Sequence, residues 1–464
     1  MKFIGREKEL KELKRMLNSD DFQAALIYGR RRVGKTELIK EAVKDHKDCV
    51  IFFVAEKAPF QQNVEGLARA VTSFFHESYL QFNDLDHVLE YVFMKSVSKP
   101  VILIIDEYPF LRGDDSSVDS KFQIAIDRYH HDSRMKLILC GSYMDVMKQI
   151  VDANEPLFGR FTSILYLKPF DYYDASKFFP NSTSEQKLEW YSCFGGIPFY
   201  LNMIDPKESL QNNLERLLIP SGSILENEIV LQMNSELSKI QGLNGILSSI
   251  GQGLHSFKDL NKQYAGSHSG VNYSLNKLLN MDLVEKSAPI NDPNNAKQRA
   301  YYIADNLLDF YYTFLHRQMT ARTIMDPGAF YREYIKEVLK NNYLPAKFEA
   351  VTREYLIRKN RAQLIEPPLT SVGRYVYHDK GTKTSGEFDA VSRDKKGWTL
   401  YECKYQKGVM TAAVIAAKKQ QAEDLGLDFY RYGFVSKNGF GKETASGSDI
   451  LVTLDDLYDS ALNG

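Results

Sequence analysis

The sequence predicts an α/β protein whose N-terminal part is a mostly parallel sheet covered by helices. Short apolar runs alternate with segments of helical periodicity, and the runs are Ala24–Tyr28, Cys49–Ala55, Val101–Ile105 and Met135–Cys140. Continuous apolar runs are typical of strands covered on both faces, and strand–helix alternation favours parallel pairing. Because ligands bind beyond the carboxyl ends of such strands, we expect the chemistry of this part to lie there.

The first apolar run leads into a glycine-containing, basic loop. Gly29 and Gly34 have the separation that precedes Lys-Thr in phosphate-binding loops. Glycines let backbone N–H groups wrap phosphates, and the N-terminus of the following helix favours an anion. Lys35 can reach the β- and γ-phosphates of a nucleotide, and the Thr36 hydroxyl can ligate Mg²⁺. The predicted nucleotide site comprises Gly29, Arg30, Arg31, Arg32, Val33, Gly34, Lys35 and Thr36. What the three arginines contact stays open.

Two further runs add polar residues at their carboxyl ends. Asp106 would hold Mg²⁺ through water, and Glu107 would polarise the attacking water. Ser142 can sense the γ-phosphate or cap the following helix. Arg160 precedes a strand predicted over 161–167, and it either approaches a phosphate in its own or a neighbouring subunit or lies on the surface.

The composition excludes a protein drawn to nucleic acid or membrane by its overall charge. The formal net charge of the 464 residues is -1, so such contacts would need a local patch. The cysteines are dispersed without metal-ligand spacing and are expected to be reduced thiols; they are Cys49, Cys140, Cys193 and Cys403. The N-terminus has no apolar signal core and no segment approaches a membrane span. We therefore expect a cytoplasmic protein without membrane contact.

Six short motifs stand in an order seen in a known family. They are Phe3–Glu7, Gly29–Thr36, Ile104–Glu107, Cys140–Ser142, Phe158–Arg160 and Gly195–Pro198. In this order they resemble the archaeal-type P-loop ATPases, a prokaryotic branch related to the AAA+ and STAND NTPases. The resemblance implies an ATPase core over residues 1–170 and a helical lid over 171–234, with Gly195–Pro198 facing the nucleotide. It also implies a finger-like role for Arg160. Many AAA+ proteins carry Asn where this chain has Ser142, which bears on the efficiency of hydrolysis.

Residues 235–305 have the element order helix, helix, helix, β-hairpin, which is that of a winged helix. The third helix, over 271–279, would carry the base-contacting side chains Asn272, Tyr273, Asn276 and Lys277, with the loop 291–295 as the wing. One lysine supplies little phosphate neutralisation, so packing or protein contact is an equal alternative to DNA reading. Residues 306–339 are expected to form connecting helices.

A second chemical signal lies near the C-terminus. Two predicted strands, over 386–391 and 398–405, form a hairpin in which period-two alternation puts Glu402 and Lys404 on one face. Asp389 can approach that pair from the neighbouring strand. Carboxylates can hold Mg²⁺ or Mn²⁺, and a lysine can orient water or stabilise a phosphorane. The alternative is an exposed hairpin with a surface ion pair.

A helix predicted over 347–357 adds Glu349 as a third carboxylate. Together, Glu349, Asp389, Glu402 and Lys404 resemble the PD-(D/E)XK nuclease core. The resemblance implies a restriction-endonuclease-like α/β domain over 340–464, with the three carboxylates as metal ligands and Lys404 as a catalytic residue. The chain departs from the pattern where Phe388 precedes the first acid in place of proline.

The predicted function is that of a cytoplasmic, ATP-hydrolysing AAA+-like protein. Its nucleotide state would control DNA engagement or cleavage by the C-terminal domain. The cofactors would be ATP and Mg²⁺, with Mg²⁺ or Mn²⁺ at the C-terminal site, and DNA and further copies of the chain are candidate partners. The alternative is a slow, STAND-like ATP switch that binds protein or DNA partners without nuclease activity.

Overall fold

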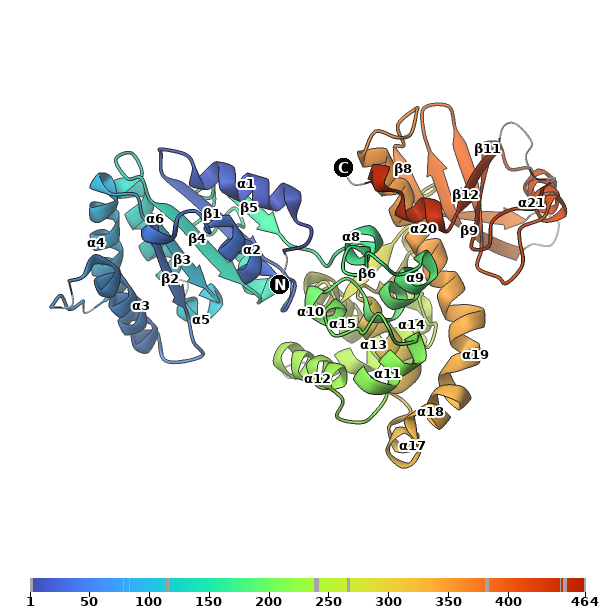
Figure 1. Cartoon of the computed structure of the whole chain (residues 1–464), viewed down its shortest axis with the longest axis horizontal. Helices are drawn as coiled ribbons and strands as arrows, with labels where there is room; N and C mark the ends of the chain where they lie inside the picture. The colour runs from blue at the N-terminus through green and yellow to red at the C-terminus, as the bar shows by residue number, and fades with distance from the viewer. Residues whose placement is uncertain are drawn as a thin grey trace. The chain divides into compact units, whose positions relative to one another are not determined.

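The computed structural model of the protein describes residues 3–77, 79–82, 84–113, 115, 117–237, 242–264, 268–379, 384–442, 444 and 449–462. Contacts divide the chain into two units (Figure 1). The first contains Met1–Pro169 and Ile197–Phe199, and the second contains Phe170–Gly196 and Tyr200–Gly464. The three residues after Gly195 and Gly196 therefore belong to the first unit, although the residues before and after them in the chain belong to the second.

The first unit is built on a five-stranded parallel sheet in the order β2-β3-β4-β1-β5. Its strands are β1 (Gln23–Tyr28), β2 (Val50–Val54), β3 (Ile102–Asp106), β4 (Lys136–Gly141) and β5 (Ser163–Tyr166). β3 is buried at every position, as the continuous apolar run before Asp106 predicts. The predicted parallel sheet is confirmed.

Helices cover both faces of this sheet. They are α1 (Glu7–Leu17), α2 (Lys35–Ala42), α3 (Phe60–Phe75), α4 (Leu85–Ser98), α5 (Tyr108–Arg112), α6 (Ser117–Tyr129) and α7 (Met144–Gln149). One core joins α1 and α2 to alternate strand residues such as Ile27 and Ile104. The other core packs α3, α4, α5 and α6 against the strand residues that point to the opposite face, such as Leu26 and Ile105. The two cores fix the strand ends where the predicted nucleotide site lies.

The second unit begins with short helices. They are α8 (Tyr172–Ser176), α9 (Ser184–Phe194), α11 (Leu210–Leu217) and α12 (Ile224–Leu237), and between α9 and α11 the chain forms α10 (Pro198–Leu201), whose first two residues belong to the first unit. Side-chain caps start several of them, and at α9 Thr183 and Gln186 form a reciprocal capping box. Gly195, with φ 73°, ends α9 in the left-handed region that favours glycine. The predicted helical character of 171–234 is present.

Residues 235–305 contain the predicted element order. The elements are α13 (Leu243–Gly251), α14 (Phe257–Gln263), α15 (His268–Asn280) and an antiparallel pair, β6 (Val284–Ser287) with β7 (Ala300–Ile303). On α15, Val271 and Leu275 face the core, while Asn272, Tyr273 and Asn276 are exposed. The polar face of α15, on which DNA reading would depend, is therefore exposed. The assignment of residues 235–305 to a winged helix stays a prediction.

A run of helices then leads to α20 (Leu344–Arg361). It comprises α16 (Asn306–Phe310), α17 (Met319–Ile324), α18 (Pro327–Phe330) and α19 (Lys336–Val338), interrupted by π-helical turns at Tyr311–Leu315, Tyr331–Ile335 and Leu339–Tyr343. The aromatic side chains Phe310, Tyr312 and Phe314 are buried, so this region is core, as the sequence predicts. Within the described residues no helix combines the length and the apolar character that a membrane crossing requires.

The last part is a mixed five-stranded sheet in the order β12-β11-β10-β9-β8. Its elements are β8 (Ser371–Asp379), β9 (Thr384–Arg393), β10 (Trp398–Lys404), α21 (Ala412–Asp424), β11 (Phe429–Ser436) and β12 (Ile450–Thr453). The predicted hairpin is β9 and β10, which pair antiparallel from Trp398 opposite Arg393 to Tyr401 opposite Ala390. Continuing this register puts Asp389 across from Glu402.

The loop of the β6–β7 hairpin lies along β8, the edge strand of this sheet. Ile290 N–H donates to the Arg374 carbonyl at 2.8 Å, and the Asn291 amide bonds both the carbonyl (2.7 Å) and the N–H (3.1 Å) of Val376. The Arg374 guanidinium bonds Ser287 and also pairs with Glu387 at 2.6 Å. The loop that was predicted to be a DNA wing thus contacts β8 of the same chain and covers the edge of its sheet.

Glu354 on α20 joins the short helices to the C-terminal part. Its carboxylate accepts from the Tyr172 N–H at 3.1 Å and from the Tyr191 hydroxyl at 3.0 Å. Nearby, Arg358 pairs with Asp171 at 2.6 Å and Asp174 at 3.0 Å. Burial, followed by the negative charge of Asp171, raises the pKa of Glu354 from 4.5 to about 7.

Replacing Glu354 by glutamine is expected to flatten the pH dependence of stability. The native carboxyl binds its proton more tightly than the unfolded one, so stability falls as pH rises from about 4.5 to about 7. At pH 8 the wild type has lost about 3 kcal/mol that a neutral amide keeps. We expect Glu354→Gln to match the wild type at pH 5 and to exceed it at pH 8 in urea unfolding. A variant that is less stable at pH 8 would contradict this explanation.

Candidate functional site

The predicted phosphate loop connects the carboxyl end of β1 to the N-terminus of α2. Gly34 has φ 96°, a conformation that favours glycine, at the residue that caps α2. Gly29 lies so close to the segment that follows β5 that a Cβ atom on it would be 2.3 Å from the Leu167 carbonyl oxygen. Both glycines are therefore required by the local backbone.

Lys35 lies inside the loop and is only 6% exposed. Its ammonium group donates to the Gly29 carbonyl (2.9 Å), the Arg30 carbonyl (3.1 Å) and the Ser142 hydroxyl (2.9 Å). Burial lowers the pKa of Lys35, while the Cys140 thiol and the acids Glu107 and Asp106 oppose that shift. The lysine is thus held where phosphates would bind, with neutral oxygens as its acceptors.

The acidic pair at the end of β3 meets the loop. The Thr36 hydroxyl donates to Asp106 Oδ2 at 2.7 Å, which brings together the two residues predicted to hold Mg²⁺. A hydroxyl and a carboxylate are ligands that suit Mg²⁺. The residues at this site therefore fit Mg²⁺ together with nucleotide phosphates, and Thr36 and Asp106 would hold the ion.

Ser142 links the predicted catalytic acid to the lysine. Its hydroxyl donates to Glu107 Oε1 at 3.0 Å and accepts from Lys35. The other oxygen, Glu107 Oε2, is buried and has no hydrogen-bond partner among the described residues. The N-cap position of α7 is Tyr143, one residue after Ser142, and a role for Ser142 in sensing the γ-phosphate stays a prediction. An acceptor left without a donor is what a bound water would satisfy.

The loop arginines and their neighbours form contacts that the sequence pattern does not reveal. The Arg32 guanidinium stacks on the Phe199 ring at 3.7 Å from its centroid. Arg30 is buried, and Val33 is fully buried in the core with α2. Arg6, which lies in the motif Phe3–Glu7 but has no predicted role, donates to the Val33 carbonyl at 3.3 Å and to the Lys168 carbonyl. Sequence spacing gives no signal for such contacts.

Arg160 is paired with an acid of its own unit. Its guanidinium bonds both oxygens of Asp127 on α6, at 3.2 and 3.0 Å, and the Phe158 carbonyl at 2.7 Å. A finger-like role would need this pair to open, and that role stays a prediction.

The C-terminal carboxylates come together at one small cavity. Glu349 from α20, Asp389 from β9 and Glu402 from β10 line a space of 50 Å³. Burial, then the charges of Asp389 and Glu402, raises the pKa of Glu349 to about 8. Burial and the charge of Glu387 also raise the pKa of Asp389. Such crowding of carboxyl groups is typical of sites that bind cations.

Two lysines hold Glu402. Lys404 pairs with one carboxylate oxygen at 2.6 Å, and Lys418 of α21 pairs with the other at 2.7 Å. Throughout the described ranges no three acidic, histidine or cysteine side chains converge closely enough to hold a metal ion. The donor chemistry of Glu349, Asp389 and Glu402 suits a divalent cation, but their arrangement in this structure does not, and the metal set stays a prediction. Lys418 was not predicted, because its helix carries no motif.

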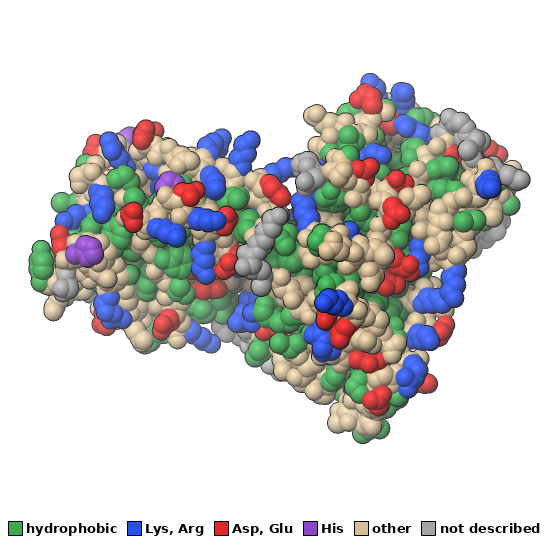
Figure 2. Space-filling model, viewed as in Figure 1, with side chains coloured by type: hydrophobic (Ala, Val, Ile, Leu, Met, Phe, Trp, Pro, Cys, Tyr) green, Lys and Arg blue, Asp and Glu red, His purple; other side chains and the backbone are tan. Residues whose placement is uncertain are grey.

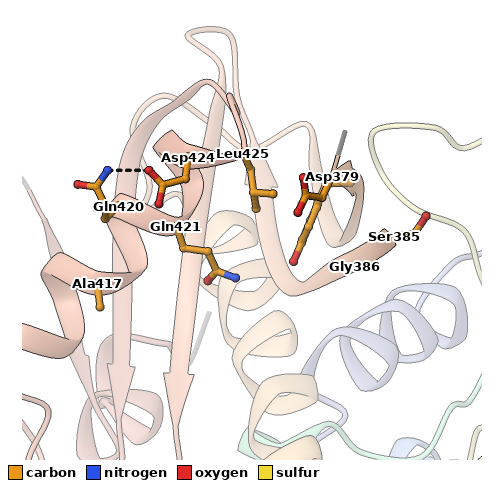
Figure 3. A pocket seen from close by; sticks show the side chains of 9 residues that line it. Asp379, Ser385, Gly386, Ala417, Gln420, Gln421, Asp424 and Leu425 are labelled. Carbon is orange, nitrogen blue, oxygen red and sulfur yellow. Dashed lines mark hydrogen bonds between the residues drawn. The ribbon is translucent and has the colours of Figure 1, made fainter. Parts of the chain in front are cut away.

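A larger, open pocket of 520 Å³ lies between the β8–β9 hairpin and α21 (Figure 3). Gln420 donates to Asp424 there at 2.8 Å. Among the described residues that line this pocket there is no lysine or arginine. On the face shown in Figure 2, basic and acidic side chains are interspersed, in line with the net charge of -1.

Comparisons with known proteins agree with the geometry of the first unit. Residues 3–204 match a family described as an ATPase domain predominantly from Archaea. Residues 311–423 match a family described as archaeal and bacterial proteins of unknown function, which names no activity. A Walker-type ATPase of Pyrococcus abyssi has the same fold, with 18% identity, a TM-score of 0.50, and coverage of 67% of this chain and 96% of that one.

Two curated proteins of Methanocaldococcus jannaschii are also similar. An uncharacterized protein is 29% identical over 463 residues, covering 98% of this chain and 100% of its own length. An uncharacterized ATP-binding protein is 44% identical over 45 residues, or 10% of this chain and 76% of that protein. With the buried lysine and the Thr36–Asp106 pair in place, these findings support one conclusion. The chain is an ATPase, and its match to the ATPase family spans residues 3–204.

Proposed function

We propose that this ATPase uses its nucleotide state to control metal-dependent DNA cleavage by the C-terminal sheet. The observation that carries the proposal is the cavity lined by Glu349, Asp389 and Glu402, with Lys404 bonded to Glu402. Three acids gathered beside a lysine, of which Glu349 and Asp389 have a raised pKa, are costly to assemble unless the chain uses them. A divalent cation there would supply charge neutralisation for a phosphodiester and an activated water.

At the first site, each residue has a separate role in ATP hydrolysis. Lys35 neutralises the β- and γ-phosphates, and Thr36 and Asp106 hold Mg²⁺. Glu107 accepts a proton from the attacking water through its unpartnered Oε2. Ser142 keeps Glu107 oriented by bonding its other oxygen.

Helix α9 supports nucleotide control because it bonds the strands that carry the C-terminal site. Within the second unit, Glu189 accepts from the Tyr405 hydroxyl at 3.4 Å, and Tyr405 directly follows Lys404. Glu185 pairs with Lys437 just beyond β11. A helix bonded to this sheet at several points transmits displacement as a rigid element.

The other end of α9 continues into the nucleotide site. Gly195 and Gly196 follow it in the chain, and Ile197–Phe199 then belong to the first unit. There the Phe199 ring lies under Arg32 of the phosphate loop. A change in this loop on ATP binding would therefore act on the residues joined covalently to α9.

A slow ATP switch without nuclease activity is the second candidate. The observation that favours it is the β6–β7 loop bonded along β8 of the same chain, so that Asn291 of the predicted wing contacts a strand of this chain and not DNA. The two candidates differ in turnover: a switch hydrolyses ATP slowly as a monomer, whereas a nuclease motor turns over fast as an oligomer. We propose a cytoplasmic location and self-association through the ATPase domain, the arrangement in which Arg160 could reach a neighbouring nucleotide.

Replacing Lys404 by alanine tests the nuclease half. We expect Mn²⁺-dependent cutting of supercoiled plasmid or branched DNA by the wild type, and a loss of at least about 100-fold in Lys404→Ala, because the lysine orients water or stabilises charge at the phosphate. Lys407→Ala is the matched control, since Lys407 is an exposed loop residue three positions further on. ATP hydrolysis should be unchanged in both variants.

Absence of any Mn²⁺- or Mg²⁺-dependent cut by the wild type, with ATP hydrolysis intact, would rule out the nuclease half. Equal cutting by the wild type and Lys404→Ala would instead remove Lys404 from the reaction. In the first case the slow-switch function would be the better explanation.

A further inference from the structure

The carboxylate of Glu402 is fully engaged by lysines. One oxygen is 2.6 Å from the Lys404 ammonium, and the other is 2.7 Å from the Lys418 ammonium. The Glu402 side chain is 15% exposed, so these short pairs lie in a partly dehydrated setting where charge interactions are strong. Each oxygen therefore already accepts one charge-assisted contact, and both ammonium groups lie where they repel a cation that approaches Glu402.

The two lysines differ in how firmly they are held. Lys418 is 17% exposed, and its ammonium lies 4.6 Å from the centroid of the Phe388 ring, a core residue. It comes from α21, whose Ala422 packs in the same core. Lys404 is 37% exposed and ends β10. Lys404 can therefore leave Glu402 at lower cost than Lys418 can.

The pairing of Glu402 with two lysines explains why the three acids share a cavity but do not form a metal-binding group. Glu349, Asp389 and Glu402 line one cavity, yet no metal-binding group of three forms among the described residues. A carboxylate paired with two ammonium groups has no net attraction left for a divalent ion, and each ammonium repels that ion.

We propose that Lys418 is a positioning residue that restrains Glu402 and sets the affinity of the C-terminal cavity for a hard divalent cation, Mg²⁺ or Mn²⁺. The cation enters as Lys404 moves away, while Lys418 keeps its oxygen of Glu402 and limits binding. The inference rests on the proposed metal-dependent function. Its consequence is that removing Lys418 strengthens metal binding, whereas removing a residue of purely structural importance weakens it.

The test is Mn²⁺ binding to the full-length protein without nucleotide, measured by calorimetry. Lys418→Met keeps the aliphatic stem on Phe388 and should lower the dissociation constant at least about 10-fold, because one repelling charge is gone. Lys418→Arg should restore wild-type affinity. Lys419→Met is the matched control: this adjacent lysine pairs with Asp449 at 2.6 Å, so its loss should leave Mn²⁺ affinity unchanged.

Thermal melting establishes that each variant is folded, and Lys418→Gln replaces Lys418→Met if the latter is not. If the wild type binds Mn²⁺ and Lys418→Met binds it equally or less tightly, the proposed restraint of Glu402 by Lys418 is wrong, while the proposed nuclease function stands. Absence of Mn²⁺ binding at millimolar concentration in the wild type and in every Lys418 variant would overturn the proposed function itself, and the restraint with it.

Discussion

Lys35→Met is expected to abolish ATP turnover, with a loss of more than about 100-fold. The Lys35 ammonium is a buried cation of the phosphate loop, and it is held by Gly29, Arg30 and Ser142 oxygens. Without it, the β- and γ-phosphates lose the ammonium group that would neutralise them, so nucleotide affinity should fall together with turnover. Equilibrium binding of a fluorescent ATP analogue and phosphate release measure the two effects.

Lys40→Met is the control for Lys35→Met. Lys40 lies on the same helix, and its exposed side chain pairs with Glu37 at 3.2 Å. Surface pairs of this kind contribute less than about 1 kcal/mol. The control should therefore bind and hydrolyse ATP as the wild type does. Full activity in Lys35→Met would remove the loop from the ATPase site.

Glu107→Gln is expected to separate binding from hydrolysis. The amide keeps an oxygen to accept from Ser142, so the site should retain its shape. It cannot accept a proton from water, and turnover should therefore fall about 10²- to 10⁴-fold. ATP affinity should stay within about threefold of the wild-type value, since Lys35, Thr36 and Asp106 are unchanged.

Single-turnover hydrolysis combined with a nucleotide-binding titration measures the Glu107→Gln effect. Glu37→Gln is the control, because Glu37 is an exposed acid on α2 whose partner is Lys40. Undiminished turnover in Glu107→Gln would show that another group polarises the water.

The nucleotide site could be predicted because its information is local. Gly29, Gly34, Lys35 and Thr36 lie within eight consecutive positions, and Asp106 follows a strand that is apolar throughout. Parallel pairing then brings the strand ends together without further information. The same reasoning gave the β9–β10 hairpin, since period-two alternation and a short turn fix its register.

What could not be predicted depends on contacts between distant segments. Lys418 reaches Glu402 from a helix without a motif, and the Asn291 contact with Val376 spans 85 positions. The stacking of Phe199 on Arg32 likewise depends on the chain returning to the first unit between two stretches of the second. Sequence periodicity describes faces of single elements and carries no information about which faces meet.

Nucleotide control of the C-terminal site is tested most directly by measuring Mn²⁺-dependent DNA cleavage with a non-hydrolysable ATP analogue, with ADP and without nucleotide. Glu107→Gln with ATP serves as a second form of the ATP-bound state. We expect cleavage with the ATP analogue to differ from cleavage with ADP by at least about fivefold, the size of an ordinary coupling between sites. Equal cleavage in all three conditions, with nucleotide binding demonstrated, would contradict control of the C-terminal site by the ATPase domain.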